Sequence, residues 1–257
     1  MEYVAARLGA DGIAKGEVRL AKDLGQLVEW VRAGEVDWVT GTPYTVLQLN
    51  RQAGTRWLAR RWKNGVTEYR TCFITRKEGA VRTLDDLRGG RIVMESADST
   101  SGFMMPMAML LRHPLEMVHL EGWSDPVPSG KTGYWLSGSA HATAARVAAG
   151  DVEAGAVSDQ DWRNDNELPE LIRKKLRVFH QTGTYPRAIE VTRPGLPAPL
   201  REHLLEILRH AHENPAGERI LRAFDNTTRF DSIPEQTLQE LEQADGVMRR
   251  VKGYGAP

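Results

Sequence analysis

Two short segments of the chain share one residue pattern, which is typical of a helix stop followed by a tight turn and a short strand. AGEVD at residues 33–37 follows an apolar helical pattern over residues 22–33. AGDVE at residues 149–153 follows an Ala-rich helical pattern over 140–148 and leads into the strand pattern 154–157. Glycine just after the last helical residue is a common helix stop. The repeated unit predicts an α/β fold made of two lobes of similar construction.

Composition limits the classes of partner. The chain has 257 residues, enough for two lobes of ordinary size. Its 34 basic and 34 acidic side chains are scattered, so no global field draws it to nucleic acid or to an anionic membrane. No apolar run approaches the ~18 to 20 residues of a membrane helix, which argues against direct membrane insertion. The N-terminus carries Glu2 early and lacks the basic and apolar regions of a signal peptide.

Between the repeated units, the pattern alternates strands with helices. Residues 69–76 are rich in β-branched and aromatic side chains and predict a strand, and residues 91–95 predict another. A helix follows over residues 103–112, with Pro106 in its first turn. Residues 113–135 are rich in loop-forming residues. Other predicted helices are a short one at 84–88 and longer ones at 199–212 and 234–250.

The junction between the strand at 91–95 and the helix at 103–112 carries the strongest local signal. Ser99, Thr100 and Ser101 are three successive hydroxyl residues before Gly102, at a helix start. The first N–H groups of a helix are unpaired and carry partial positive charge, which suits a phosphate-like anion. The alternative interpretation is an ordinary N-cap with an additional serine.

Other residues are weaker candidates when taken singly. His141 opens the Ala-rich helix over residues 140–148. Its ring could donate a hydrogen bond to an anion, or it could be a capping or surface residue. Tyr44 and Tyr69 lie at predicted loop ends, where a phenol can contact a ligand or pack in the core. No serine-hydrolase elbow, zinc-protease or P-loop motif occurs, so the sequence predicts neither an enzyme nor a cofactor.

Several motifs follow one another in an order typical of a known family. Residues 68–112 contain YRTCFITR, LDDLRGG and STSG; GEVDWVTGTPY lies upstream and SGSAHATAARVAAGDVEAGAVSDQDW downstream. In this order, over about residues 16–225, they resemble the phosphate/phosphite/phosphonate solute-binding proteins of ABC transporters. Each motif is weak alone, and the ordered set is specific.

The resemblance implies a type II periplasmic-binding-protein fold whose ligand lies in a cleft between two lobes. It places lobe 1 at residues 1–78 plus 183–257 and lobe 2 at residues 79–182. It also implies a set of ligand-binding residues drawn from both lobes and the hinge. These are Tyr44, Tyr69, Ser99, Thr100, Ser101, His141, Ser158 and Asp159.

Three departures from the family pattern affect what is expected. The family has a first strand and a ligand loop before the region where this sequence starts, so we expect a fold without the usual first strand and an upstream segment with a signal peptide. Ser158 stands before Asp159 where the family often has two acids, which favours a simple oxyanion over an aminophosphonate. Cys72, the single cysteine, excludes an internal disulfide; it lies in the hinge strand, where arsenite-sensing relatives could use a thiol.

The leading hypothesis is therefore a periplasmic or otherwise extracytoplasmic protein that captures phosphate, phosphite or a phosphonate for an ABC permease. The first alternative is an oxyanion sensor, in one version binding arsenite through Cys72, that partners a histidine kinase. A second alternative, a cytoplasmic enzyme on the same fold, is motivated only by the absence of a signal peptide.

Overall fold

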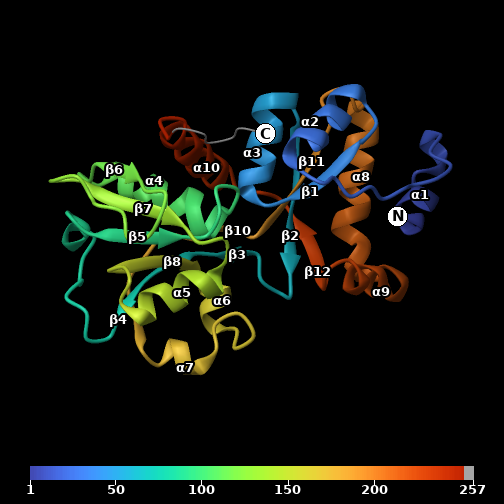
Figure 1. Ribbon diagram of the computed structural model, residues 1–257. Coiled ribbons are helices and arrows are strands. Elements are labelled where there is room, and N and C mark those ends of the chain that lie inside the picture. The colour runs from blue at the N-terminus through green and yellow to red at the C-terminus, as the bar shows by residue number, and fades with distance from the viewer. Residues whose placement is uncertain (252–257) are drawn as a thin grey trace. The chain divides into compact units, whose positions relative to one another are not determined.

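The computed structural model describes residues 1–251, and these divide into two compact units (Figure 1). Unit 1 holds residues 1–68 and 186–241, and unit 2 holds residues 69–185 and 242–251. The chain therefore passes between units after Glu68, after Tyr185 and again after Leu241. The lobe bounds expected from the sequence are different, and that assignment stays a prediction. Among the described residues, no helix combines the length and apolar character needed to span a membrane.

Unit 1 is built on a four-stranded sheet in the order β1-β11-β2-β12. Each neighbouring pair is antiparallel. Residues 1–37 of this unit form helices and no strand. The strands are β1 (Trp38–Gly41), β2 (Arg56–Lys63), β11 (Ala188–Thr192) and β12 (Thr227–Asp231).

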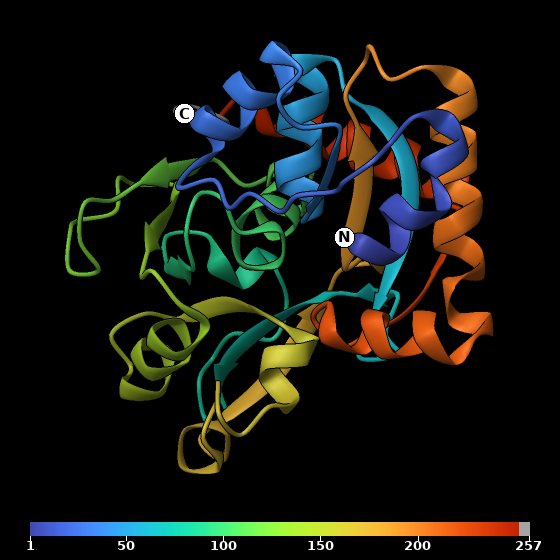
Figure 2. The same ribbon diagram turned by 90° about the vertical axis from the view of Figure 1, so that its right-hand side faces the viewer.

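Helices cover both faces of this sheet. α3 packs on β1 and β11, and α8 packs on β2 and β12 (Figure 1; Figure 2 gives the turned view). The core beside α8 contains Leu58, Leu204, Leu208 and Phe230. The helices are α1 (Glu2–Arg7), η1 (Gly9–Asp11), α2 (Leu24–Ala33), α3 (Pro43–Ala53), α8 (Ala198–His210), η4 (Ala211–Glu213), α9 (Pro215–Ala223) and α10 (Glu235–Met248), which continues into unit 2.

Unit 2 contains a six-stranded sheet in the order β6-β7-β5-β8-β4-β9. β6, β7, β5 and β8 are parallel, and β4 pairs antiparallel with both β8 and β9. β6 and β7 lie in the segment that the sequence predicted to be loop-rich. That prediction was wrong for these strands, because pairing along the sheet decides strand formation more than local composition does. The strands are β4 (Thr71–Arg76), β5 (Arg91–Met94), β6 (Met117–His119), β7 (Thr132–Leu136), β8 (Ala154–Ser158) and β9 (Leu176–Gln181).

Helices again lie on the two faces, with α4 on one side of the sheet and α5 on the other (Figure 1). α5 packs through Ala144 and Val147 against Cys72, Ile74 and Val157. A two-stranded sheet of β3 (Glu68–Tyr69) and β10 (Tyr185–Pro186) occurs where the chain passes between units. The helices of unit 2 are η2 (Asp85–Leu87), the π-helical turn η3 (Thr100–Met104), α4 (Met105–Arg112), α5 (Ala140–Ala149), α6 (Asp159–Arg163) and α7 (Glu170–Arg173).

Candidate functional site

Three helices of unit 2 begin just beyond the ends of three neighbouring parallel strands. η3 follows β5, α5 follows β7 and α6 follows β8, and these strands are adjacent in the order β7-β5-β8. The carboxyl ends of parallel strands meet at one edge of a sheet, so the three helix starts lie at that edge. This is the usual position of ligands in open α/β sheets. Each start leaves N–H groups unpaired and positively polarised.

Each of these helix starts is capped by a serine. Ser99 accepts from the N–H of Gly102 (2.9 Å), Ser139 from Ala142 (3.1 Å) and Ser158 from Asp161 (2.9 Å). A side-chain cap fixes the orientation of the first helical turn and stabilises it by roughly 0.5 to 2 kcal/mol. We call the helix start at residues 99–102, which the sequence predicted to bind an anion, the cradle. It is thus one of three similar helix starts at the same edge.

Ser99 has a second partner that the sequence prediction did not include. Its hydroxyl donates to Oε2 of Glu95 at 2.6 Å, so its proton is already used within the chain. Glu95 also packs against Gly102, where a Cβ would lie 2.3 Å from the Glu95 carboxyl carbon. A larger residue at position 102 would therefore require the Glu95 side chain to move. Glu95 directly follows β5, and its position at a strand end was the signal that could have identified it.

Acidic neighbours surround Glu95. Its pKa is raised to about 7, mainly by burial and in smaller part by the charges of Asp161, Glu167 and Asp98, against the lowering effect of the Ser99 hydrogen bond. A carboxyl with this pKa is part protonated near neutrality. Such shifts in a cluster of groups at a strand end are typical of functional sites.

Thr100 and Ser101 are both buried at this edge. The carbonyl of Ser101 accepts a 2.7 Å hydrogen bond from the Thr71 hydroxyl, which lies 2.8 Å from the Tyr185 hydroxyl. Tyr69 packs edge-on against Tyr185 with ring centroids 4.8 Å apart. The structure therefore brings the predicted residues Tyr69 and Ser101 into one connected group, with Thr71 and Tyr185 as members that the sequence did not suggest.

Ser158 and Asp159 start α6 beside the first residues of β4. The Ser158 hydroxyl donates to Oδ2 of Asp161 at 2.6 Å. Asp159 is 7% exposed, and its carboxylate accepts from the N–H of Arg70 at 3.2 Å. The Ser158 side chain thus fixes the first turn of α6, and Asp159 connects that turn to Arg70, the residue before β4.

His141 lies in the first turn of α5 and is exposed, with Nδ1 3.2 Å from the carbonyl oxygen of Glu167. Tyr44 belongs to unit 1, where it is buried in the first turn of α3 behind the Thr42 cap. His141 therefore lies at the same edge of unit 2 as the three helix starts. The ligand role of Tyr44 stays a prediction.

Cys72 is buried in β4 and faces the core beneath α5. Burial raises the pKa of its thiol, and Gln181 Nε2 donates to its sulfur at 3.3 Å. Among residues 1–251, no group of three His, Cys, Asp or Glu side chains could hold a metal ion. These surroundings fit a structural cysteine and give no support to the arsenite version of the sensor hypothesis.

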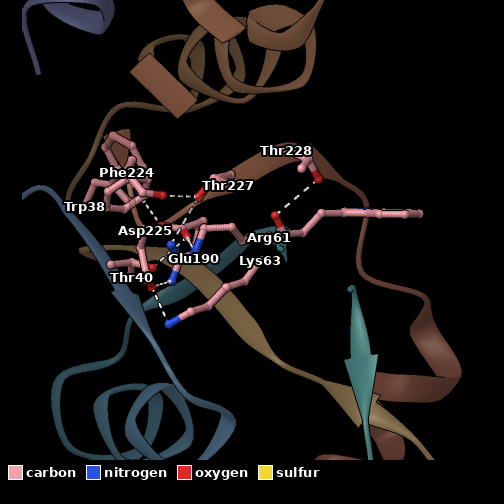
Figure 3. Close-up of polar contacts among 10 residues, drawn as sticks. Trp38, Thr40, Arg61, Lys63, Glu190, Phe224, Asp225, Thr227 and Thr228 are labelled. Atoms are coloured by element: carbon pink, nitrogen blue, oxygen red, sulfur yellow. Dashed lines mark hydrogen bonds and ion pairs between the residues drawn. The ribbon is translucent and has the colours of Figure 1, made fainter. Parts of the chain in front are cut away.

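Unit 1 contains a second polar cluster, centred on the fully buried Glu190 of β11 (Figure 3). Its carboxylate accepts from Trp38 Nε1 at 2.5 Å and from the Thr40 hydroxyl at 2.7 Å. Arg61 Nε lies 3.5 Å from Oε1, without a hydrogen bond at that nitrogen. Burial raises the pKa of Glu190 to about 7, against the lowering effects of Thr40, Arg61 and Trp38.

Arg61 connects Glu190 to the segment that precedes β12. Its guanidinium donates to the Thr227 hydroxyl at 3.2 Å and to Asp225 at 3.4 Å, and Lys63 also pairs with Asp225 (Figure 3). Phe224 covers the guanidinium at 4.7 Å from its ring centroid. The cluster is closed by its own partners, which indicates a structural role across β1, β11 and β2.

Comparison with known proteins agrees with the fold. The sequence pattern of the family described as "ABC transporter, phosphonate, periplasmic substrate-binding protein" matches residues 1–238. The chain belongs to this family. Its members are solute-binding proteins of ABC transporters and not enzymes, and an extracytoplasmic location follows from the same membership.

Relatives of this phosphonate-binding family member include proteins from two bacteria. XAC2383 from Xanthomonas citri is 30% identical in its ATP-bound structure, with a TM-score of 0.88 over 98% of this chain and 92% of that chain. In its chloride-bound structure the identity is 31% and the TM-score 0.86, over 96% and 90%. PhnD1 from Prochlorococcus marinus MIT 9301, in complex with methylphosphonate, is 20% identical with a TM-score of 0.64, over 97% and 91%.

The curated sequence of "Probable ABC transporter phosphite binding protein PhnD1" from Prochlorococcus marinus (strain MIT 9301) is 29% identical over 124 residues. The match spans 46% of this chain and 39% of the length of that relative. The structural neighbours are two-lobed type II periplasmic binding proteins, which confirms the predicted fold class.

Proposed function

We propose that this member of the phosphonate-binding family captures a small phosphorus oxyanion at the edge of unit 2 where η3, α5 and α6 begin. The observation that carries the proposal is the set of three serine-capped helix starts after adjacent parallel strands. Helix starts supply N–H donors and positive potential without a formal charge, and they suit an anion that must be released again.

Ser99 and Ser101 have different proposed tasks in the cradle. Ser99 shapes it, since its hydroxyl is held between Glu95 and the N–H of Gly102. Ser101 and the first N–H groups of η3 are the proposed donors to the oxyanion. Each charge-assisted hydrogen bond is worth about 1.5 to 3 kcal/mol. Tyr69 and His141 are the proposed contacts to the ligand on either side of these donors. Ser158 and Asp159 already make hydrogen bonds within the chain, and any contact they make to the ligand is in addition to those bonds.

The ligands named for two relatives share a phosphorus–oxygen group. PhnD1 is in complex with methylphosphonate, and XAC2383 is bound to ATP. These ligands support a phosphonate or phosphate group as the chemistry recognised by this chain, with phosphite as the third candidate because of the curated PhnD1 relative.

The carboxyls around Glu95 refine the ligand class. Burial is the main cause of the raised pKa of Glu95, and the charges of Asp161, Glu167 and Asp98 add to it, so this side of the cradle disfavours the further negative charge of a fully ionised dianion. It favours an oxyanion that keeps a proton, or one that carries an ammonium group. This observation weighs against the sequence argument from Ser158 that set aminophosphonates aside.

Calorimetry of the full chain with phosphate, phosphite, methylphosphonate, 2-aminoethylphosphonate and sulfate tests the proposal. We expect a phosphorus oxyanion to bind, and Ser101→Ala to weaken it by about 10- to 100-fold, the equivalent of one charge-assisted hydrogen bond. Asp23→Ala, which removes the cap of α2 in unit 1, is the matched control and should leave affinity unchanged. Binding of no phosphorus oxyanion, or equal affinity in Ser101→Ala, would overturn it.

The proposed partner is the permease of an ABC importer, on the strength of the family. In proteoliposomes, the ligand-loaded protein should stimulate ATP hydrolysis by that permease and its ATPase. Stimulation of a histidine kinase instead, with no effect on the importer, would support the sensor alternative.

A further inference from the structure

Unit 2 contains a cavity of about 700 Å³ at the opposite end of α4 from the cradle. Its walls come from the segment before η2, the last turn of α4 and β9. The eight residues of α4 separate the two places by about 12 Å at 1.5 Å per residue, in addition to the length of η3. The cavity falls within the size range of pockets for organic ligands and is larger than a bare oxyanion requires.

Basic side chains dominate the polar part of its lining. Arg82, Arg112, His113 and His180 line it, and Asp85 is the carboxylate among its lining residues. Within residues 1–251, neither Arg82 nor Arg112 lies within ion-pair distance of a carboxylate; Arg82 donates to the carbonyls of Gly79 and Val81. Two guanidinium groups are therefore available to an anion.

The like charges are crowded at this cavity. Burial lowers the pKa of His180, and the nearby His113 lowers it further. Burial also lowers the pKa of Arg177, with a second contribution from Arg82, and both arginines donate to the carbonyl of Val81. Asp85 relieves part of this charge, because its Oδ1 lies 3.0 Å from His113 Nε2 and 3.8 Å from an Arg88 nitrogen. A bound polyanion would relieve the rest.

A β-bulge in β9 adds two rings to the wall. Phe73 pairs with His180 while Ile74 pairs with Val178, so Phe179 has no partner in the ladder. A bulge re-aims side chains that would otherwise alternate. As a result, Phe179 and His180 both line the cavity, and both pack against Phe73, at 6.1 and 5.8 Å between ring centroids. The cavity thus has a ring surface next to its arginines.

We propose that this cavity is a second ligand site, for a phosphorylated compound with a planar ring, that is, a nucleotide. Arg82 and Arg112 hold the phosphates, because guanidinium groups match phosphate oxygens in a bidentate geometry. Phe179 and His180 stack on the ring, a contact worth about 1 to 3 kcal/mol per base in other nucleic-acid sites. This site is separate from the oxyanion cradle and does not depend on it.

Titration calorimetry with ATP, adenosine and tripolyphosphate tests the second site in the full chain. We expect ATP to bind at least tenfold more tightly than either part alone. The double variant Arg82→Gln/Arg112→Gln should weaken ATP at least tenfold while phosphate or phosphonate affinity at the cradle stays within twofold. Both arginines are exposed, so the fold should survive, and circular dichroism checks this.

Two controls locate the binding. Arg219→Gln, at an exposed arginine of unit 1, should leave ATP affinity unchanged. Ser101→Ala should leave it unchanged as well if ATP occupies the cavity. The inference is overturned if ATP does not bind at millimolar concentration, if tripolyphosphate binds as tightly as ATP, or if Ser101→Ala weakens ATP and the double arginine variant does not.

Discussion

The hydroxyl of Ser99 donates a 2.6 Å hydrogen bond to the Glu95 carboxylate while accepting one from the N–H of Gly102. The cap of η3 is therefore coupled to a carboxyl whose pKa burial raises to about 7. Because ionised Glu95 adds negative charge beside the proposed anion site, the protonation of this one side chain should influence both ligand affinity and the shape of the cradle.

Glu95→Gln should strengthen oxyanion binding above pH 7 and flatten its pH dependence between pH 6 and 8. The amide can still accept from Ser99 but carries no charge, and removing one nearby charge is worth about 1 kcal/mol, or roughly fivefold in Kd. Calorimetry with methylphosphonate at pH 6 and pH 8 measures the change in Kd. Glu170→Gln, which changes an exposed acid of the same unit, is the control. A pH profile unchanged from the parent protein would contradict the prediction.

Gly102→Ala should destabilise unit 2 and weaken oxyanion binding. The new Cβ would lie 2.3 Å from the Glu95 carboxyl carbon, and the Ser99 hydrogen bond prevents that carboxyl from moving freely. Overpacking of this kind costs about 1 to 3 kcal/mol. Urea unfolding and calorimetry measure the two effects.

Gly183→Ala is the matched control for that variant, because nothing lies within 4 Å of its added Cβ. Adding Glu95→Ala to Gly102→Ala should recover part of the lost stability, since the clashing carboxyl is removed. A double variant no more stable than Gly102→Ala would show that another contact is responsible.

Glu190→Ala should destabilise unit 1 by about 3 to 5 kcal/mol, because it leaves the buried Arg61 without its buried carboxylate partner. Thr228→Ala, at the exposed edge of the same cluster, should cost less than about 0.5 kcal/mol. Urea unfolding followed by tryptophan fluorescence compares the two. Equal effects would mean that the buried network contributes no more than a surface contact.

Stability should decline as pH rises from about 4.5 through 7, in part because of Glu190. Its pKa is raised from 4.5 to about 7 in the folded chain, so the folded state binds more protons than the unfolded state in that window. The contribution is fully present below pH 4.5 and lost above 7, on the order of 3 kcal/mol. Unfolding of Glu190→Gln at pH 5 and 8 should show a smaller difference than in the parent; an equal difference would exclude Glu190 as the cause.

Local sequence patterns predicted most elements because their signals lie within a few residues. The glycine stops after residues 33 and 149 were correct, and Gly34 and Gly150 both adopt the left-handed conformation expected of such stops. The helices at 199–212 and 234–250 are α8 and α10, with ends shifted by one or two residues. β7 was missed because the loop-forming residues before it outweighed the strand-forming Thr132, Tyr134 and Trp135; its pairing with β5 and β6 decides the strand.

The candidate site likewise contains features that local sequence reveals and features that depend on contacts between distant segments. Hydroxyl residues before a glycine revealed the start of η3, and the order of motifs revealed the family, since both are written along the chain. Glu95 as the partner of Ser99, Thr71 and Tyr185 beside Ser101, and the bulge at Phe179 depend on contacts between distant segments. The sequence by itself determined an α/β solute-binding fold and a hydroxyl-rich helix start for which anion binding is proposed. Only the tertiary structure decided which hydroxyls are already bonded and which carboxyls are shifted, because burial and pairing are properties of the folded chain.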